Sequence, residues 1–385
     1  MEKLFEFFNK TGPYPRLTFL GINGVDLAGH FQGPSSELYS SCLIETDKII
    51  GELTEFLKGR KDNNGKPLFD KSLFVIFGDH GMVDSENFID IAALLKAEGM
   101  KVSDLGSIAH LVTEKINPFW MVDREILSVP GGSNITELYV RKKQRGRFLE
   151  WDEFCSYREL REYPIQSWFQ DSKIDLLTYL SGIEGIGEII AGIQENVVHV
   201  ITPNRGSATI FRRPGMGNDT FVYRIDDPNA RVDPFGYLQS EAAIDLVCTD
   251  PDMSISNWVE ERFDHYFYSI RDWVRATLDT GYPAAVPLIP KALAKHHTAS
   301  DIIVNAKSPY NFSKYFKGDH GILENESVST AMLIAGEGVC AGASLEGMML
   351  IDTLPTLLKI LNIRPPASFE RFLDGKIYND LAEPQ

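Results

Sequence analysis

Three features that would assign this sequence to a class of protein are scarce or missing. Its four cysteines, Cys42, Cys155, Cys248 and Cys340, lie far apart without C-x-x-C spacing, which indicates buried or free thiols and not a disulfide framework. No stretch approaches ~18 consecutive apolar residues, so no membrane-spanning helix is expected. The first residues lack the apolar region of a signal peptide, and we expect a cytoplasmic protein by default.

Positive charge is also scarce. The chain has 38 lysines and arginines against 54 aspartates and glutamates, a formal net charge of −16, so we expect no nucleic-acid binding beyond nucleotide-like substrates. Acidity does not exclude a small phosphorylated substrate, because two bound divalent cations would place about four positive charges in the site itself. With 385 residues, 43% of them hydrophobic, the chain can bury a large core.

One short apolar run stands out at residues 73–77, and it is followed by Gly78, Asp79 and His80. Such a run, bounded by turn and polar residues, predicts a strand that is buried on both faces of a parallel sheet. Ligand sites in open α/β sheets form beyond the carboxyl ends of these strands. A carboxylate and an imidazole at that point suit a divalent cation, although an ordinary polar loop explains the pair equally well by itself.

The neighbouring segments predict an alternation of strands and helices. We expect a strand over residues 16–22, a helix from Glu37 to about Lys58, and, after the strand at 73–77, a helix over 86–98. This order favours an α/β fold with a mainly parallel sheet flanked by helices. We expect residues 1–100 to form the first part of the core, 101–287 an inserted cap or accessory region, and 288–385 the second part.

Other elements are predicted from shorter signals. Strands are expected at residues 135–141, 196–202, 206–211, 220–225 and 301–305, and helices at 258–278 and 352–361.

Five side chains follow the predicted strands of the core. Asp26 and His30, four residues apart, follow the strand at 16–22, where Gly29 would allow a sharp turn; Asp79 and His80 follow the next strand, and His320 stands in a third polar loop. Because the carboxyl ends of parallel strands share one edge, all five can converge. Two imidazoles with a carboxylate suit a zinc-like ion, and paired metals ~3.5–4 Å apart commonly stabilise phosphoryl transfer.

Three motifs together resemble a known family. They are D-x-x-G-H at residues 26–30, followed by Gly33-Pro34, then F-G-D-H-G-M at 77–82 and G-D-H-G at 318–321. In order and rough spacing they resemble the alkaline phosphatase superfamily, most closely its type I phosphodiesterase/nucleotide pyrophosphatase branch, over about residues 14–95 and 285–375.

The resemblance implies an alkaline phosphatase-like core and a two-metal hydrolase of phosphate esters, phosphodiesters or pyrophosphates. It assigns Asp26, His30 and His320 to one metal ion, and Asp79 and His80 to the other. Family members use zinc most often and manganese in some branches. A threonine or serine acts as nucleophile.

The sequence departs from the family upstream of these motifs. A strand ending in Asp-Gly, which supplies a further metal ligand and leads to the nucleophile, has no counterpart: Asn23 is no carboxylate. We therefore assign no nucleophile and expect the usual N-terminal segment to be missing. Three explanations remain open: another chain supplies it, as an upstream-encoded partner segment or in a homo-oligomer; the chain is a truncated product of marginal stability; or the middle region takes its place. A truncated or split gene is our first expectation. The alternative function is a truncated or pseudoenzyme fragment that retains metal binding without turnover.

Overall fold

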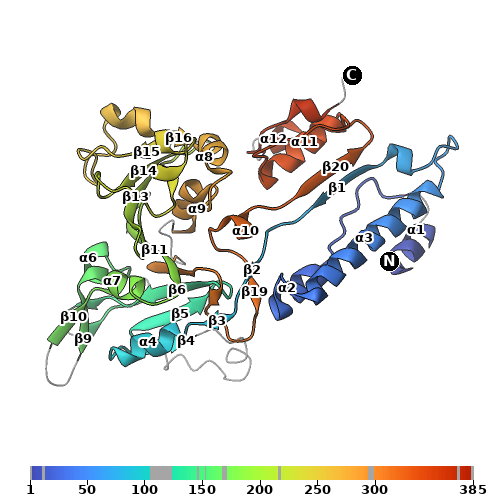
Figure 1. The fold of residues 1–385 in the computed structure, drawn as a ribbon. Helices are drawn as coiled ribbons and strands as arrows, with labels where there is room; N and C mark the ends of the chain where they lie inside the picture. Colours follow the sequence, from blue (N-terminus) through green and yellow to red (C-terminus); the bar gives the residue numbers. More distant parts are fainter. Residues whose placement is uncertain are drawn as a thin grey trace. The chain divides into compact units, whose positions relative to one another are not determined.

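A computed structural model describes residues 2–10, 14–104, 124–144, 147–151, 153–166, 171–215, 218–293, 299–370 and 373–382. The chain divides into two compact units (Figure 1). Unit 1 combines Met1–Gly81 with Thr330–Gln385, and unit 2 is Met82–Ser329. The sequence predicts three segments, residues 1–100, 101–287 and 288–385, whose boundaries differ from those of the two units. This division into three segments stays a prediction.

Unit 1 contains a two-stranded antiparallel sheet and several helices. Strand β1 (Leu73–Phe77) pairs with β20 (Met332–Gly336), with Leu73 opposite Gly336 and Phe77 opposite Met332. The other elements are α1 (Glu2–Lys10), α2 (Gly24–Gln32), α3 (Glu37–Lys58), η1 (Phe69–Lys71), η6 (Leu350–Asp352), α11 (Thr353–Ile360), α12 (Ala367–Glu370) and η7 (Asn379–Leu381).

Two expectations for unit 1 are wrong. Residues 16–22 form no strand, and the side chains of Leu17 and Phe19 are 86% and 82% exposed. Strand β1 is only partly buried, and its last residue, Phe77, is exposed. Both errors have one physical reason: β20 is the only strand that pairs with β1 in the described part of unit 1, so no wider sheet covers the apolar run.

The long helix α3 begins where the sequence predicts. The Ser36 hydroxyl accepts a hydrogen bond from the Tyr39 amide at 3.2 Å, which satisfies one of the free donors of the first turn. None of the residues of α3 is fully buried. Its capping signals therefore fix where the helix starts, while its packing within the described residues is thin.

Unit 2 is built on a ten-stranded mixed sheet. The strand order is β15-β14-β13-β12-β11-β17-β6-β5-β4, and β16 pairs with β14. Only the pairs β14–β15 and β4–β5 are parallel. The strands are β4 (Val102–Asp104), β5 (Ile126–Pro130), β6 (Ile135–Val140), β11 (Ile186–Gln194), β12 (Val197–Thr202), β13 (Gly206–Arg213), β14 (Thr220–Ile225), β15 (Val247–Cys248), β16 (Tyr268–Ser269) and β17 (Ile302–Ala306).

The α/β class is confirmed, but the expectation of a mainly parallel sheet is wrong. Strands β11 to β14 follow one another through short connections, which can join only antiparallel neighbours. The connection from β11 to β12 contains Asn196 with φ of 61°, and the one from β12 to β13 contains Asn204, also with φ of 61°. Asparagine tolerates this left-handed conformation, so these turns reverse the chain at little cost.

Helices and short strand pairs surround this sheet. They are α4 (Ile91–Ala97), α6 (Tyr157–Arg161), α7 (Leu176–Ser181), α8 (Ile270–Thr277), α9 (Ala285–Ala292), α10 (Asn325–Val328), η3 (Tyr237–Gln239), η4 (Ile244–Leu246), η5 (Glu261–Tyr266), and the pairs β2 (Val83–Asp84) with β19 (Gly318–Asp319), β3 (Asn87–Phe88) with β18 (Tyr310–Asn311), β7 (Lys143–Gln144) with β8 (Arg147–Phe148), and β9 (Tyr163–Gln166) with β10 (Asp171–Ile174).

The single helix expected over residues 258–278 is wrong. The structure divides this segment into η5, β16 and α8. Ser269 starts α8 with a capping box, because its hydroxyl accepts from the Asp272 amide while the Asp272 carboxylate accepts from the Ser269 amide. The aromatic residues of the segment do fall at helical spacing, but this internal cap starts a new helix instead of continuing one.

The core of unit 2 lies on both faces of its sheet. Ile189 and Ala191 of β11 belong to one apolar cluster, whereas the intervening Ile190 belongs to another that includes Trp273 and Tyr223. This alternation is the period of two that a strand imposes. In unit 1, one small cluster contains the buried residues Val339, Ile360 and Leu381. No described helix is both long enough and apolar enough to cross a membrane.

Candidate metal-binding site

The first two predicted metal ligands lie on helix α2. Asp26 is in its first turn and His30 in its last, and a separation of four residues places both side chains on one face. The His30 Nε2 atom lies 3.3 Å from Asp26 Oδ1. Gly29 lies inside the helix and is buried, so the sharp turn expected there is wrong; the helix ends instead at Gly33, with φ of 86°.

Asp79 and His80 follow β1, as the sequence predicts. Gly78 separates them from the strand, and its amide donates to the Ala331 carbonyl at 3.3 Å. A Cβ atom at Gly78 would collide with the Thr330 hydroxyl, so any other residue here would force the Thr330 side chain to move. The backbone therefore fixes the direction in which the Asp-His pair leaves the strand.

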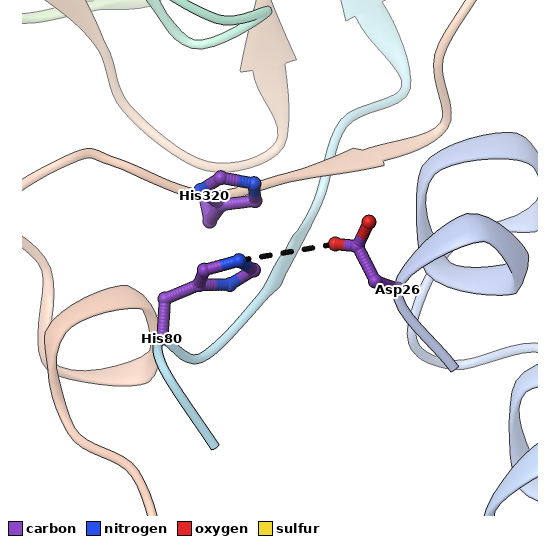
Figure 2. A group of neighbouring side chains, drawn as sticks. All are labelled: Asp26, His80 and His320. Carbon is purple, nitrogen blue, oxygen red and sulfur yellow. Dashed lines mark ion pairs between the residues drawn. The ribbon is translucent and has the colours of Figure 1, made fainter. Parts of the chain in front are cut away.

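The His80 ring is held by the backbone on one side and faces carboxylates on the other. Its Nδ1 lies 2.9 Å from the Gly81 carbonyl oxygen, and with the ring proton donated there, Nε2 carries the lone pair. Nε2 lies 3.6 Å from Asp79 Oδ1 and 3.9 Å from Asp26 Oδ1, the latter pair marked by the dashed line in Figure 2. Asp26 Oδ1 thus lies between the imidazoles of His30 and His80.

Asp26 Oδ1 lacks a hydrogen-bond donor among the described residues. This atom is shielded from solvent, although the Asp26 side chain as a whole is 40% exposed. Two ligands ~2.0–2.1 Å from a tetrahedral zinc ion lie roughly 3.3 Å apart, which is the separation of Asp26 Oδ1 and His30 Nε2. A set of carboxylate oxygens and imidazole nitrogens is also the donor set that zinc accepts. These residues therefore fit a divalent cation.

The fifth predicted ligand, His320, belongs to unit 2. Its neighbour Asp319 is buried and accepts hydrogen bonds from the Ser133 amide and, at 2.8 Å, from the His320 amide. Asp319 therefore fixes the loop before His320. His320 Nε2 lies 3.9 Å from Asp319 Oδ1, and the side chain is 31% exposed. His320 thus follows a residue whose carboxylate is held by two backbone amides.

Three arginines of unit 2 are held by acidic residues or by a backbone carbonyl. Arg212 pairs with Asp219 at 2.8 Å and Arg213 with Asp264 at 2.7 Å, while Arg205 donates to the Asp233 carbonyl. Sequence reasoning assigned nothing to His199, yet this residue lies in a polar network of unit 2. Its signal in the sequence is an imidazole inside the apolar run of β12.

The α/β fold thus presents aspartate and histidine side chains that are candidates for holding a metal ion. Residues 2–148 match the model of the family described as type I phosphodiesterase / nucleotide pyrophosphatase, which confirms the resemblance seen in the motifs. The matched segment contains Asp26, His30, Asp79 and His80. A match to this family indicates a phosphodiesterase- or pyrophosphatase-type hydrolase, and the family is generally metal-dependent. No curated protein matches the chain significantly.

Proposed function

We propose that the chain is a metal-dependent hydrolase of phosphate esters, phosphodiesters or pyrophosphates that uses a two-metal site. One observation carries the proposal: Asp26 Oδ1 is buried without a hydrogen-bond donor and lies 3.3 Å from one imidazole nitrogen and 3.9 Å from another. A buried carboxylate oxygen without a donor is costly unless a cation satisfies it. The family match adds the chemistry of phosphate ester cleavage.

In this proposal Asp26, His30 and His320 hold one ion, and Asp79 and His80 hold the other. Zinc is our first choice, with manganese as the alternative. Bound divalent ions would offset the charge of a small phosphorylated substrate and activate an attacking oxygen. The His80 ring would be kept in its metal-binding tautomer by the Gly81 carbonyl, and Gly78 would keep the Asp-His pair at its place after β1.

The test is the zinc content of the purified chain together with hydrolysis of a p-nitrophenyl phosphodiester. After reconstitution with zinc, elemental analysis should find about two ions per chain, with measurable turnover. Asp26→Asn should lower the zinc content and reduce turnover by about a hundredfold or more, because even residues that only orient metal ligands cost 10–100-fold. The matched control is Asp70→Asn, an exposed carboxylate of unit 1 in η1, which should change neither quantity.

Two results would contradict the proposal. The first is a chain that binds no zinc at all; the second is equal zinc content and turnover in Asp26→Asn and the wild type. A chain that binds zinc but shows no turnover would favour the second candidate, a pseudoenzyme fragment that retains the metal site. The thin core of unit 1, with three buried residues in its apolar cluster, is the observation that favours this second candidate.

We further propose that unit 1 acts together with another chain, either an upstream-encoded segment or a second copy. The support is its sheet, in which β1 and β20 pair only with each other among the described strands. Two-stranded sheets are marginal alone and present unpaired backbone groups along their outer edges. Light scattering after size-exclusion chromatography distinguishes a homo-oligomer from a monomer.

A further inference from the structure

Unit 2 contains a polar pocket that the proposed metal chemistry does not use. It has a volume of about 710 Å³ and lies between the end of α7 and the hairpin β12–β13. All its lining residues are described, and they include Arg161, Ser181, His199, Ser207 and Lys307. In Figure 1, α6 and α7, drawn in green, lie next to each other in unit 2. The volume is in the range of small-molecule sites.

The histidine in this pocket is held on both sides. His199 is 9% exposed, its Nε2 lies 2.6 Å from Asp226 Oδ2, and its Nδ1 lies 2.8 Å from the Tyr157 hydroxyl. With the Nε2 proton donated to the carboxylate, Nδ1 accepts the Tyr157 proton. Since both ring nitrogens have protein partners, His199 is a fixed part of the wall and positions other groups.

Asp226 is the carboxylate that accepts the hydrogen bonds of this network. Besides His199, its carboxylate accepts hydrogen bonds from Ser207 Oγ at 2.6 Å, Thr209 Oγ1 at 2.9 Å and Arg224 Nη2 at 2.9 Å. Burial by itself would raise the pKa of Asp226, but the hydrogen bonds from His199, Ser207 and Thr209 outweigh it and hold the pKa at about 2. The acceptor is therefore charged throughout the physiological range.

The hydroxyl groups of the pocket present acceptors. Ser207 donates its proton to Asp226, Ser181 donates to the Thr178 carbonyl at 2.9 Å, and the Thr178 hydroxyl donates to Asp175 Oδ2 at 2.9 Å. A hydroxyl that has donated its proton offers only lone pairs to a ligand. A wall of this kind suits a ligand with several hydroxyl donors, such as a sugar.

Two cationic side chains line the same pocket. Lys307 is exposed and follows β17, and Arg161 ends α6, where its Nε donates to Asp175 Oδ2 at 2.5 Å and its Nη1 donates to the Tyr157 hydroxyl at 3.3 Å. The anionic lining residue Glu184 accepts from the Tyr310 hydroxyl at 2.8 Å. An ammonium and a guanidinium are the usual partners of a phosphate group.

We propose that this pocket binds a sugar phosphate, with Arg161 and Lys307 toward the phosphate and the hydroxyl oxygens of Thr178, Ser181 and Ser207 toward the sugar. The network of Tyr157, His199 and Asp226 positions both sets, because Arg161 donates to one end of it and Ser207 to the other. A free sugar phosphate and the ribose phosphate part of a nucleotide both carry these groups, so both belong to the proposed class of ligand.

The test is calorimetric titration of the full chain in the presence of a metal chelator. The probes are ribose 5-phosphate, adenosine monophosphate, inorganic phosphate and ribose. Ribose 5-phosphate should bind saturably and more tightly than inorganic phosphate or ribose, and Lys307→Gln should weaken it about tenfold, the effect of losing one charged contact. Arg161→Gln should act similarly. Lys314→Gln, another exposed lysine of unit 2 that lies outside the pocket, should leave binding unchanged.

Several outcomes would overturn the proposal. They are no saturable binding of either sugar phosphate, unchanged binding in both Lys307→Gln and Arg161→Gln, or equal affinity for ribose 5-phosphate and inorganic phosphate. Tighter binding of adenosine monophosphate than of ribose 5-phosphate would identify a nucleotide as the source of the sugar phosphate. Because the chelator removes bound metal, the result is independent of the proposed hydrolase, and exposed Lys307 can be replaced without disturbing the core.

Discussion

The two units of this chain bury their side chains very differently. Unit 2 has three apolar clusters, among them the ring cluster of Tyr223, Phe235, Tyr237 and Trp273, each at most 2% exposed. Among its described residues, unit 1 has one small cluster. Most of the large apolar side chains that the described residues expose belong to unit 1. Four of the five proposed metal ligands nevertheless lie in unit 1.

The two units also differ in how exposed their acidic side chains are. Unit 2 buries carboxylates such as Glu188 and holds them with hydrogen bonds, whereas the side chain of Asp79 in unit 1 is 82% exposed. Groups that bind metal and substrate must be reached from solvent, while groups that stabilise a fold need not be. We therefore expect unit 2 to supply most of the free energy of unfolding, and three experiments can test this comparison.

The largest effect should come from the core of unit 2. Trp273 is fully buried, and its indole donates to the Phe221 carbonyl at 3.3 Å, so Trp273→Ala should cost about 3–5 kcal/mol of unfolding free energy. The control in unit 1, Leu354→Ala, removes a side chain that is 48% exposed and should cost about 0.5 kcal/mol or less.

Urea denaturation measures both variants. All five tryptophans of the sequence lie in unit 2, so their fluorescence follows that unit alone, while circular dichroism follows the whole chain. If Leu354→Ala lowered the unfolding free energy as much as Trp273→Ala, the contrast between the two units would be wrong, because Leu354 would then be packed as tightly as Trp273.

A smaller effect should come from the buried acid of β11. Burial raises the pKa of Glu188 from 4.5 to about 7, although Asn305 Nδ2 donates to it at 3.3 Å. Because the folded state holds the proton more tightly, the stability of unit 2 should be complete below pH 4.5 and fall as the pH rises through 7, by about 3 kcal/mol. Glu188→Gln should remove this dependence in urea titrations between pH 4.5 and 8. Glu195→Gln, an exposed neighbour in the turn after β11, should retain it.

The smallest effect should come from Asp226. Its pKa is held at about 2, below the ordinary 3.8, so its stabilising contribution of about 2 kcal/mol is present above pH 3.8 and lost as the pH falls to 2. Asp226→Asn should flatten the acid side of the stability profile, measured by tryptophan fluorescence. The adjacent, exposed Asp227→Asn serves as control. A wild-type profile that is already flat between pH 4 and 2 would show that the network does not stabilise unit 2.

Several elements could be predicted from the sequence because their signals are local. The strands β12, β13 and β14 were expected within one or two residues, since each is an apolar run bounded by asparagine, glycine or proline turns. Helix α3 was predicted from Glu37 to about Lys58, and it spans Glu37–Lys58. The spacing of Asp26 and His30 placed them together even though the expected turn is a helix, because the fourth residue returns to the same face.

The failures concern partners that are distant in the sequence. Whether the apolar run of β1 pairs in a parallel or an antiparallel sheet depends on β20, more than 250 residues further on, and no local pattern encodes that choice. The network around His199 was missed for the same reason. Tyr157 and Asp226 lie 42 and 27 residues away from His199, and only the fold brings them together.

The pairing of β2 with β19 has a consequence for the order in which the chain folds during synthesis. It places Val83, at the start of unit 2, opposite Asp319, near its end. Unit 1 is made of the first and the last part of the chain, so on the ribosome β1 must wait for β20 until unit 2 has been synthesised. Once β2 and β19 have paired, only residues 78–82 and 320–331 separate them from β1 and β20, so the loop that remains to be closed is much shorter than the sequence separation of β1 and β20.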